Sequence, residues 1–312
     1  MAVIGPTAVG KTVLGILLAE KFDGEIISGD SMQVYKGMDI GTAKATPEER
    51  KRIPHHLIDI VEPWESFSVA DFQRLALQAV QEIRERGRLP ILVGGTGLYV
   101  KALLYYPHYS FTPEGKREEI RKKWEALAAL HGSLALHREA MKVDPKAAGK
   151  LHPHDARRLV RILEEYELTG KPPSRRIPEQ EFLRSPFDLL LIGLTLERKH
   201  LYRRIEERVD RMMNEGLLEE VKRLLAVGVP KESTAMQGLG YKELIPYLEG
   251  KITLTEAVQE MKKRTRQFAK RQLTWFRHMN GIHWFSMEEE EREDSLHKIF
   301  QIVAGKFHFM EN

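Results

Sequence analysis

The sequence predicts an α/β fold in which helices flank a parallel sheet and an all-helical domain is inserted into the chain. Three observations predict it. A glycine-rich loop follows the first apolar run, later short apolar runs alternate with amphipathic helices, and charged helical patterns interrupt this alternation between residues 109 and 186. Strands that alternate with helices are typical of parallel sheets. We therefore expect a sheet domain over 1–108 and 187–312 and a helical insertion domain over 109–186.

The first elements are a strand over Met1–Ile4 and a loop with the spacing G-x-x-x-x-G-K-[ST]. In such loops backbone N–H groups cradle a phosphate, the lysine adds positive charge and the hydroxyl holds Mg²⁺. An amphipathic helix follows, which favours a P-loop NTPase-like fold over a simple glycine turn. The strand is short, so we expect the natural protein to begin a few residues earlier. The predicted diphosphate-binding residues are Gly5, Pro6, Thr7, Ala8, Val9, Gly10, Lys11 and Thr12, with Thr12 as the metal ligand.

The later elements are justified by the same patterns. Apolar runs predict strands over Glu25–Ser28, Ile91–Val93 and Leu189–Leu194, and a helical pattern covers Ala70–Arg86. Long amphipathic helices are expected after the last strand. They cover Leu201–Glu215, Leu217–Leu225 and Thr255–His278. In the insert, helices are expected over Glu118–Leu130, Ser133–Met141 and Asp155–Leu168, before a Gly- and Pro-containing linker.

Composition narrows the class of protein. The chain has 312 residues, 42% of them apolar and 30% charged, and it contains no cysteine. The absence of cysteine excludes a disulfide framework and a thiol nucleophile. It is also compatible with a protein that works in the reducing cytoplasm. No apolar run approaches the roughly 20 residues of a membrane span, and no signal peptide is visible. We expect a cytoplasmic protein with no membrane partner, working as a monomer.

Positive charge gathers near the C-terminus. Between Lys251 and Arg277 there are eight Lys and Arg residues but only two acidic ones, Glu256 and Glu260. Such a helix is either a solvated face or a binding surface for a polyanion, and a diphosphate alone would not need it. The sequence alone does not decide between a solvated helix face and a polyanion-binding surface.

Polar residues follow two of the predicted strands, at the edge where ligands of open α/β sheets bind. Asp30 comes after Glu25–Ser28, and its carboxylate is a candidate helix cap, magnesium ligand through water, or general base. Thr96 lies in a second glycine loop, Gly94–Gly97, that does not match a dinucleotide-binding fingerprint.

Several motifs, taken together, resemble the tRNA dimethylallyltransferases over nearly the whole chain. The block D-S-x-Q-x-Y-x-x-M-D-I-G-T-A-K carries most of this resemblance, because a P-loop alone is shared by very many proteins. The matching segments are Gly5–Thr12, Ile27–Lys44, Pro54–Asp59, Phe67–Phe72, Val93–Tyr99 and Arg266–Arg277.

The resemblance implies transfer of the dimethylallyl group from dimethylallyl diphosphate to N6 of an adenosine beside the anticodon of tRNA. Diphosphate is released, and Mg²⁺ is the implied cofactor. Asp30 resembles the general base of the family, Thr7 the residue that hydrogen-bonds the departing oxygen, and Arg208 the arginine that clamps the diphosphate. The acceptor adenine must be flipped out of its stack to reach a buried donor.

The resemblance also implies contacts with the tRNA anticodon stem-loop. Arg157, Arg158 and Arg161 share a helix of the insert, where arginines grip phosphates or stack on bases. His152 and His154 before that helix favour a helix entrance over a metal site. The residues around Tyr241 resemble RNA contacts of the family, but a buried core position is an equally good interpretation of this aromatic side chain. The predicted tRNA-binding residues are Asp30, Ser31, Met32, Gln33, Thr96, Arg117, Arg157, Arg158, Arg161, Gln237, Gly238, Gly240, Tyr241 and Lys242.

Three other functions use parts of the same sequence. A P-loop kinase or NTPase would use the phosphate loop for ATP, and a non-catalytic RNA-binding protein would use only the basic helices. An adenylate isopentenyltransferase would prenylate a free nucleotide. The block around Asp30 argues against the kinase and the intact loop against the simple binder. The insert and the basic helix favour RNA over a free nucleotide.

Overall fold

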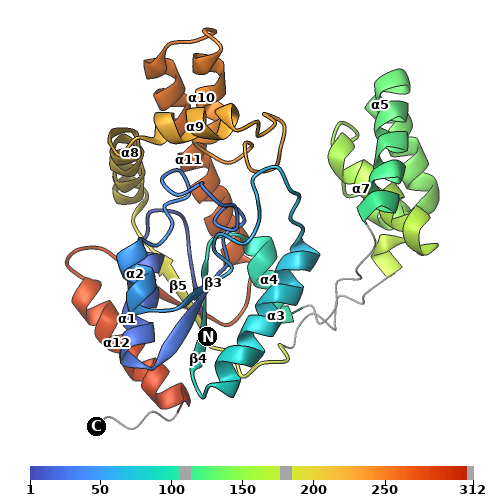
Figure 1. The fold of residues 1–312 in the computed structure, drawn as a ribbon. Helices are drawn as coiled ribbons and strands as arrows, with labels where there is room; N and C mark the ends of the chain where they lie inside the picture. Colours follow the sequence, from blue (N-terminus) through green and yellow to red (C-terminus); the bar gives the residue numbers. More distant parts are fainter. Residues whose placement is uncertain (106–113, 176–184, 308–312) are drawn as a thin grey trace. The chain divides into compact units, whose positions relative to one another are not determined.

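The larger unit of the molecule is built on a parallel sheet with the strand order β3-β2-β4-β1-β5-β6. The computed structural model of the chain describes residues 1–105, 114–175 and 185–307 (Figure 1). The register places Ile4 opposite Gly94 on one side and Gly193 on the other. The loops that follow β1, β4 and β5 therefore leave the same edge of the sheet. The strands are β1 (Ala2–Ile4), β2 (Gly24–Ser28), β3 (His55–His56), β4 (Leu89–Gly94), β5 (Leu191–Thr195) and β6 (Ile282–Ser286).

Helices cover both faces of this sheet (Figure 1). α1 (Lys11–Lys21) and α12 (Arg292–Phe307) pack on the face that contains Val3, whereas α3 (Val69–Glu85) and α4 (Gly97–Tyr105) pack on the face that contains Ala2 and Ile4. Alternate residues of β1 thus point into two separate apolar cores, as the two-residue period of a strand requires. The expected α/β fold with a parallel sheet between helices is confirmed.

A third apolar core lies beyond the sheet. Helices α8 to α11 surround it, together with the segment that follows β2, which contributes the buried Val34, Tyr35 and Met38. A short helix, α2 (Pro47–Arg52), is closed at its start by a capping box from Thr46 and Glu49. The four helices are α8 (Arg198–Asn214), α9 (Leu217–Ala226), α10 (Tyr241–Leu248) and α11 (Leu254–Arg277).

The second unit covers 108–185, and the first covers 1–107 and 186–312, one residue away from the expected limits. The second unit is helical over its described residues. α5 (Glu114–Val143) is broken at Gly132, whose φ of 76° is left-handed, so two helices meet there as the sequence indicates. Its own small core includes Leu136, Leu159 and Leu163. The remaining elements are α6 (Pro145–Ala148), α7 (Ala156–Thr169) and the 3₁₀ turn η1 (Pro173–Arg175).

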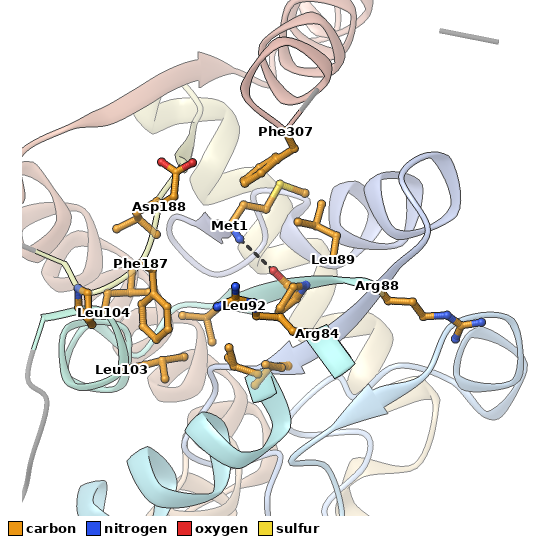
Figure 2. Close-up of a pocket in the computed structure, with 15 residues that line it drawn as sticks. Met1, Arg84, Arg88, Leu89, Leu92, Leu103, Leu104, Phe187, Asp188 and Phe307 are labelled. Atoms are coloured by element: carbon orange, nitrogen blue, oxygen red, sulfur yellow. Dashed lines mark hydrogen bonds between the residues drawn. The ribbon is translucent and has the colours of Figure 1, made fainter. Parts of the chain in front are cut away.

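A cavity of about 420 Å³ lies at the opposite edge of the sheet, where β1 and β4 begin (Figure 2). Its walls are largely apolar, with Leu92, Leu103 and Phe187 among them, and the amino group of Met1 donates to the carbonyl oxygen of Pro90 at 2.9 Å. Because the phosphate loop leaves the other end of β1, this cavity is not part of the site described below. Among the described helices, none is both long and apolar enough to cross a bilayer.

Candidate active site

The phosphate loop (residues 5–12) joins β1 to α1 through two glycines that other residues would strain. Gly5 has a φ of 148° and Gly10 a φ of 104°, and a Cβ on Gly5 would lie 2.7 Å from the carbonyl oxygen of Leu194. The first turn of α1 has no side-chain cap and no acidic residue. Its N–H groups and the positive end of the helix dipole are therefore suited to an anion.

Lys11 is the cation of this loop, and its Nζ donates to the carbonyl oxygen of Pro6 at 2.6 Å. Burial and the positive charge of Arg208 lower the pKa of Lys11 to about 7, while the carboxylate of Asp30 acts in the opposite direction. Burial likewise lowers the pKa of Arg208, and Asp30 again opposes the shift. α1, α8 and the segment after β2 thus bring two cations and one carboxylate together. A polyanion would relieve the repulsion between the two cations.

Asp30 begins the segment after β2, and its Oδ1 accepts a 2.8 Å hydrogen bond from the backbone N–H of Met32. This contact forms a local turn that holds the half-buried carboxylate at the carboxyl edge of the sheet. The turn explains how the side chain is positioned, and a role as general base is compatible with it because the second carboxylate oxygen accepts no hydrogen bond within this turn.

The second glycine loop (residues 94–97) packs directly against the Asp30 segment. A Cβ on Gly94 would lie 2.4 Å from the carbonyl oxygen of Gly29, so the two backbones approach each other as only glycine allows. Thr96 Oγ1 accepts from the backbone N–H of Ser31 at 3.1 Å. The Thr96 backbone N–H donates to the carbonyl oxygen of Gly29 at 3.3 Å. The structure therefore brings Thr96, Ser31 and Asp30 together.

Two of the predicted tRNA-binding residues in this segment also make internal contacts. Gln33 accepts from Ser28 Oγ at 2.7 Å and donates to the carbonyl oxygen of Thr42 at 3.2 Å, so its amide braces the loop that follows. Met32 packs partly against the third core, and a Cβ on Gly238 would lie 3.1 Å from its sulfur. A side chain at position 238 would therefore require Met32 to shift by a few tenths of an ångström.

Tyr241 is a core aromatic, the alternative that the sequence left open. Its ring is fully buried, and its hydroxyl donates to Glu220 Oε1 at 2.6 Å. Burial and the carboxylate of Glu220 raise the pKa of Tyr241. Of its neighbours, Gln237 is exposed and Lys242 half-buried, whereas Gly240 is a buried helix cap with a φ of 96°. Of the predicted tRNA-binding residues in this segment, only Gln237 and Lys242 are not buried.

The insert places its predicted arginines in two different environments. Arg117 is only 16% exposed and pairs with Glu164 and Glu165, both at 3.0 Å, which joins α5 to α7. Arg161 pairs with the same two carboxylates. Arg157 and Arg158 are exposed. Arg117 therefore contributes to the packing of the insert. Arg161 is exposed although it pairs with both carboxylates, and Arg157 and Arg158 face solvent.

The two histidines before α7 form a turn. The backbone N–H of His154 bonds Nδ1 of His152 at 3.2 Å, and Asp155 caps the helix that follows. Across the described parts of the chain, no three His, Cys, Asp or Glu side chains gather into a metal site. Mg²⁺ commonly keeps several waters and takes ligands from a substrate phosphate. The half-buried hydroxyl of Thr12 therefore fits an ion that binds together with a diphosphate.

Sequence reasoning missed two buried polar residues next to the site. Gln272 lies on α11 and contacts both glycine loops. Glu220 lies on α9, and its carboxylate accepts from the backbone N–H groups of Asp39, Ile40 and Gly41. Both occupy positions on the buried, otherwise largely apolar side of an amphipathic helix. A polar residue at such a position is a signal that the sequence does carry.

Comparison with known proteins decides the family. The family model described as IPP transferase matches residues 33–279. A tRNA dimethylallyltransferase of Carboxydothermus hydrogenoformans is 54% identical over 99% of this chain and 98% of its own length. This chain belongs to the tRNA dimethylallyltransferase family. A relative with the same name from Geobacillus thermodenitrificans is 50% identical over the whole of this chain and 98% of its own.

Solved structures of the family agree with the fold. A full-length tRNA isopentenylpyrophosphate transferase of Bacillus halodurans is 48% identical, with a TM-score of 0.72, over 98% of this chain and 96% of that one. A eukaryotic dimethylallyltransferase acting on tRNA is 34% identical, with a TM-score of 0.83, over 97% of this chain and 77% of that one. The α/β core with its insert is thus the fold of the tRNA dimethylallyltransferase family.

Proposed function

We propose that the chain transfers the dimethylallyl group of dimethylallyl diphosphate to N6 of the adenosine beside the anticodon of tRNA. The observation that carries this proposal is the phosphate loop, whose Lys11 interacts electrostatically with Arg208 and Asp30, in a member of this family. A diphosphate needs the cations, and an amine that becomes an N-alkyl group needs a proton acceptor.

The donor would lie along the phosphate loop. The N–H groups of the first turn of α1, Lys11 and Arg208 bind the diphosphate and stabilise the negative charge that grows as the C1–O bond breaks. The Thr7 hydroxyl would donate to the departing oxygen. Thr12 would hold Mg²⁺, which neutralises further charge on the leaving diphosphate.

The acceptor would approach from the side of Asp30 and Thr96. The lone pair of N6 forms the new bond to C1 of the allyl group, the electrons of the C1–O bond leave with diphosphate, and a proton of N6 passes to the Asp30 carboxylate. Because an aromatic amine is a weak nucleophile, orientation by this carboxylate contributes as well as proton transfer. The flipped base would have to reach the edge of the sheet where both glycine loops end.

The RNA would be held by residues outside this edge. Exposed Arg157 and Arg158 of the insert and exposed Lys270, Arg271 and Arg277 of α11 suit the phosphates of a stem and loop. We further propose that the chain works as a monomer in the cytoplasm, whose reducing conditions suit a chain without cysteine.

The proposal is tested by incubating the protein with dimethylallyl diphosphate, Mg²⁺ and unmodified tRNA. The tRNA is then digested, and the masses of its nucleosides are measured by mass spectrometry. We expect an adenosine heavier by one dimethylallyl group and an equal amount of released diphosphate. A parallel reaction with ATP in place of the donor should give neither product. Robust ATP hydrolysis without a prenylated nucleoside would support the P-loop NTPase alternative instead.

A further inference from the structure

Gln272 joins the two glycine loops of the site. It lies on α11, is 5% exposed, and is separated from Thr7 by 265 positions in the sequence. Its Oε1 accepts from the backbone N–H of Thr7 at 2.8 Å, and its Nε2 donates to the carbonyl oxygen of Gly95 at 2.9 Å. One amide side chain therefore satisfies one backbone group of each loop.

The two hydrogen bonds allow only one orientation of the amide. Exchanging its oxygen and nitrogen would set a donor against the Thr7 N–H and an acceptor against the Gly95 carbonyl. A Cβ on Gly95 would lie 2.2 Å from Nε2, so a side chain at this position would displace the amide from its hydrogen bonds. The glycine and the glutamine are therefore complementary in shape as well as in hydrogen bonding.

Contacts continue from Gln272 toward the acceptor side. Gly95 precedes Thr96, whose hydroxyl accepts from the Ser31 backbone N–H, and Ser31 follows Asp30. A path of one covalent step or one hydrogen bond at a time thus runs from Thr7 through Gln272 and Thr96 to Asp30. Its ends are the residue placed at the departing oxygen and the residue placed at the attacking amine.

The helix that carries Gln272 also touches the second glycine loop directly. A Cβ on Gly97 would lie 2.2 Å from the ring of Trp275, which follows Gln272 by less than one turn of α11. Gln272 is thus held by packing on a long helix rather than on a mobile loop, and a residue fixed in this way orients its partners.

We infer that Gln272 is a positioning residue for the reaction, which sets Thr7 against the leaving oxygen and aligns the second glycine loop with it. The inference rests on the proposed function. Gln272 touches neither donor nor acceptor in this assignment, so it acts through the backbone of Thr7 and Gly95. Its loss should therefore slow the chemical step more than it weakens the binding of either substrate.

The test compares Gln272→Met with a matched buried glutamine. Gln73 on α3 is 4% exposed and donates to the carbonyl oxygen of Ala102 at 2.6 Å, in the core on the α3 and α4 side of the sheet. Gln272→Met and Gln73→Met each remove a buried amide of the same length. We expect losses of thermal stability from both, because each removes a buried amide that hydrogen-bonds the backbone.

The rate of prenyl transfer should differ between Gln272→Met and Gln73→Met. For Gln272→Met we expect the single-turnover rate of prenyl transfer to fall about 10- to 100-fold, with the dissociation constants of tRNA and of inorganic diphosphate within about threefold of the wild type. Gln73→Met should keep the wild-type rate. Equal rates in the two variants, or a loss in Gln272→Met that lies wholly in substrate affinity, would overturn the inference.

Gln272→Glu adds a pH readout that a purely structural role would not produce. The neutral carboxyl of this variant can accept from Thr7 and donate to Gly95, as the amide does, whereas the ionised form sets an oxygen anion against the Gly95 carbonyl. We expect its rate, relative to wild type, to rise as the pH falls. A ratio independent of pH would contradict the inference, and absence of prenyl transfer by the wild type would instead contradict the proposed function.

Discussion

Lys11 Nζ donates a 2.6 Å hydrogen bond to the carbonyl oxygen of Pro6, within the same phosphate loop. The ammonium is therefore held against the loop backbone, where it interacts with the negative charge of Asp30 and the positive charge of Arg208. This arrangement concentrates positive charge where the diphosphate would leave.

The first prediction concerns that charge. Lys11→Ala should lower the single-turnover rate with dimethylallyl diphosphate by roughly a hundredfold or more, because a preorganised contact to the leaving group is lost. Lys21→Ala, at the other end of α1, serves as the control and should keep the wild-type rate. Rapid quench of a tRNA reaction measures both, and an unaffected Lys11→Ala rate would remove the lysine from the mechanism.

The second prediction separates chemistry from structure at Asp30. The asparagine oxygen of Asp30→Asn can still accept from the Met32 N–H, so the turn should persist. We expect the single-turnover rate to fall by about 10² to 10⁴, with tRNA affinity within a fewfold of the wild type. Parallel losses of rate and affinity would show that Asp30 only shapes the turn.

The third prediction concerns the arginines of the insert. Joint replacement of Arg157 and Arg158 by alanine should weaken tRNA binding and flatten its dependence on salt by up to about one unit of slope per lost phosphate contact. Arg117→Ala should chiefly destabilise the insert, because it breaks the pairs with Glu164 and Glu165. Filter binding at several salt concentrations and thermal unfolding distinguish the two effects.

A different outcome for the same variants would contradict this prediction. If Arg117→Ala flattened the salt dependence while Arg157 and Arg158 proved silent, the ion pairs seen here would have to open on RNA binding. Diphosphate binding should stay unchanged in both variants, since the phosphate loop belongs to the other unit.

The sheet and the phosphate loop follow from the sequence because their signals are local. The spacing of Gly5, Gly10 and Lys11 fixes the loop, and apolar runs fix β1, β2, β4 and β5. β3 was not expected, since it has two residues and follows Pro54. β6 was not expected either, because its exposed His283 and Trp284 hide the apolar pattern of a strand.

The site is harder to predict because its partners are distant in the chain. Asp30 and Thr96 were found from their positions after strands, and Arg208 came only from the resemblance. The roles of Gln272 and Glu220 arise from contacts with residues that are far away in the sequence. Gln272 contacts Thr7 across 265 positions, and Glu220 contacts three backbone N–H groups across 179 to 181 positions, so no local pattern reveals them. Their only local trace is a polar side chain on the buried side of a helix.

The fourth prediction is a pH dependence of stability at the start of β2. Glu25 is 2% exposed and accepts hydrogen bonds from Arg86 and Arg88, with His56 at 2.6 Å. Burial alone would raise its pKa, but these hydrogen bonds outweigh burial and lower it from 4.5 to about 2. The folded state therefore prefers the ionised form.

The sign follows from linkage. A carboxyl with a lowered pKa stabilises the fold fully above its unfolded value, and that contribution disappears as the pH falls from about 4.5 towards 2. Glu25→Gln should cost about 2–4 kcal/mol at neutral pH by removing the buried negative charge that Arg86, Arg88 and His56 share. The difference between wild type and variant, measured by urea unfolding, should shrink in acid, whereas Glu85→Gln, at an exposed position near the end of α3, should show no such trend.

The choice between tRNA and a free nucleotide as acceptor tests the central claim most directly. The measurement is the ratio of kcat/KM for unmodified tRNA to kcat/KM for AMP, with dimethylallyl diphosphate and Mg²⁺ held constant. We predict a ratio of roughly 10⁴ or more, because only tRNA engages the exposed cations of the insert and of α11 and supplies binding energy for the transition state. A ratio near one would contradict the account and assign the chain to nucleotide prenylation.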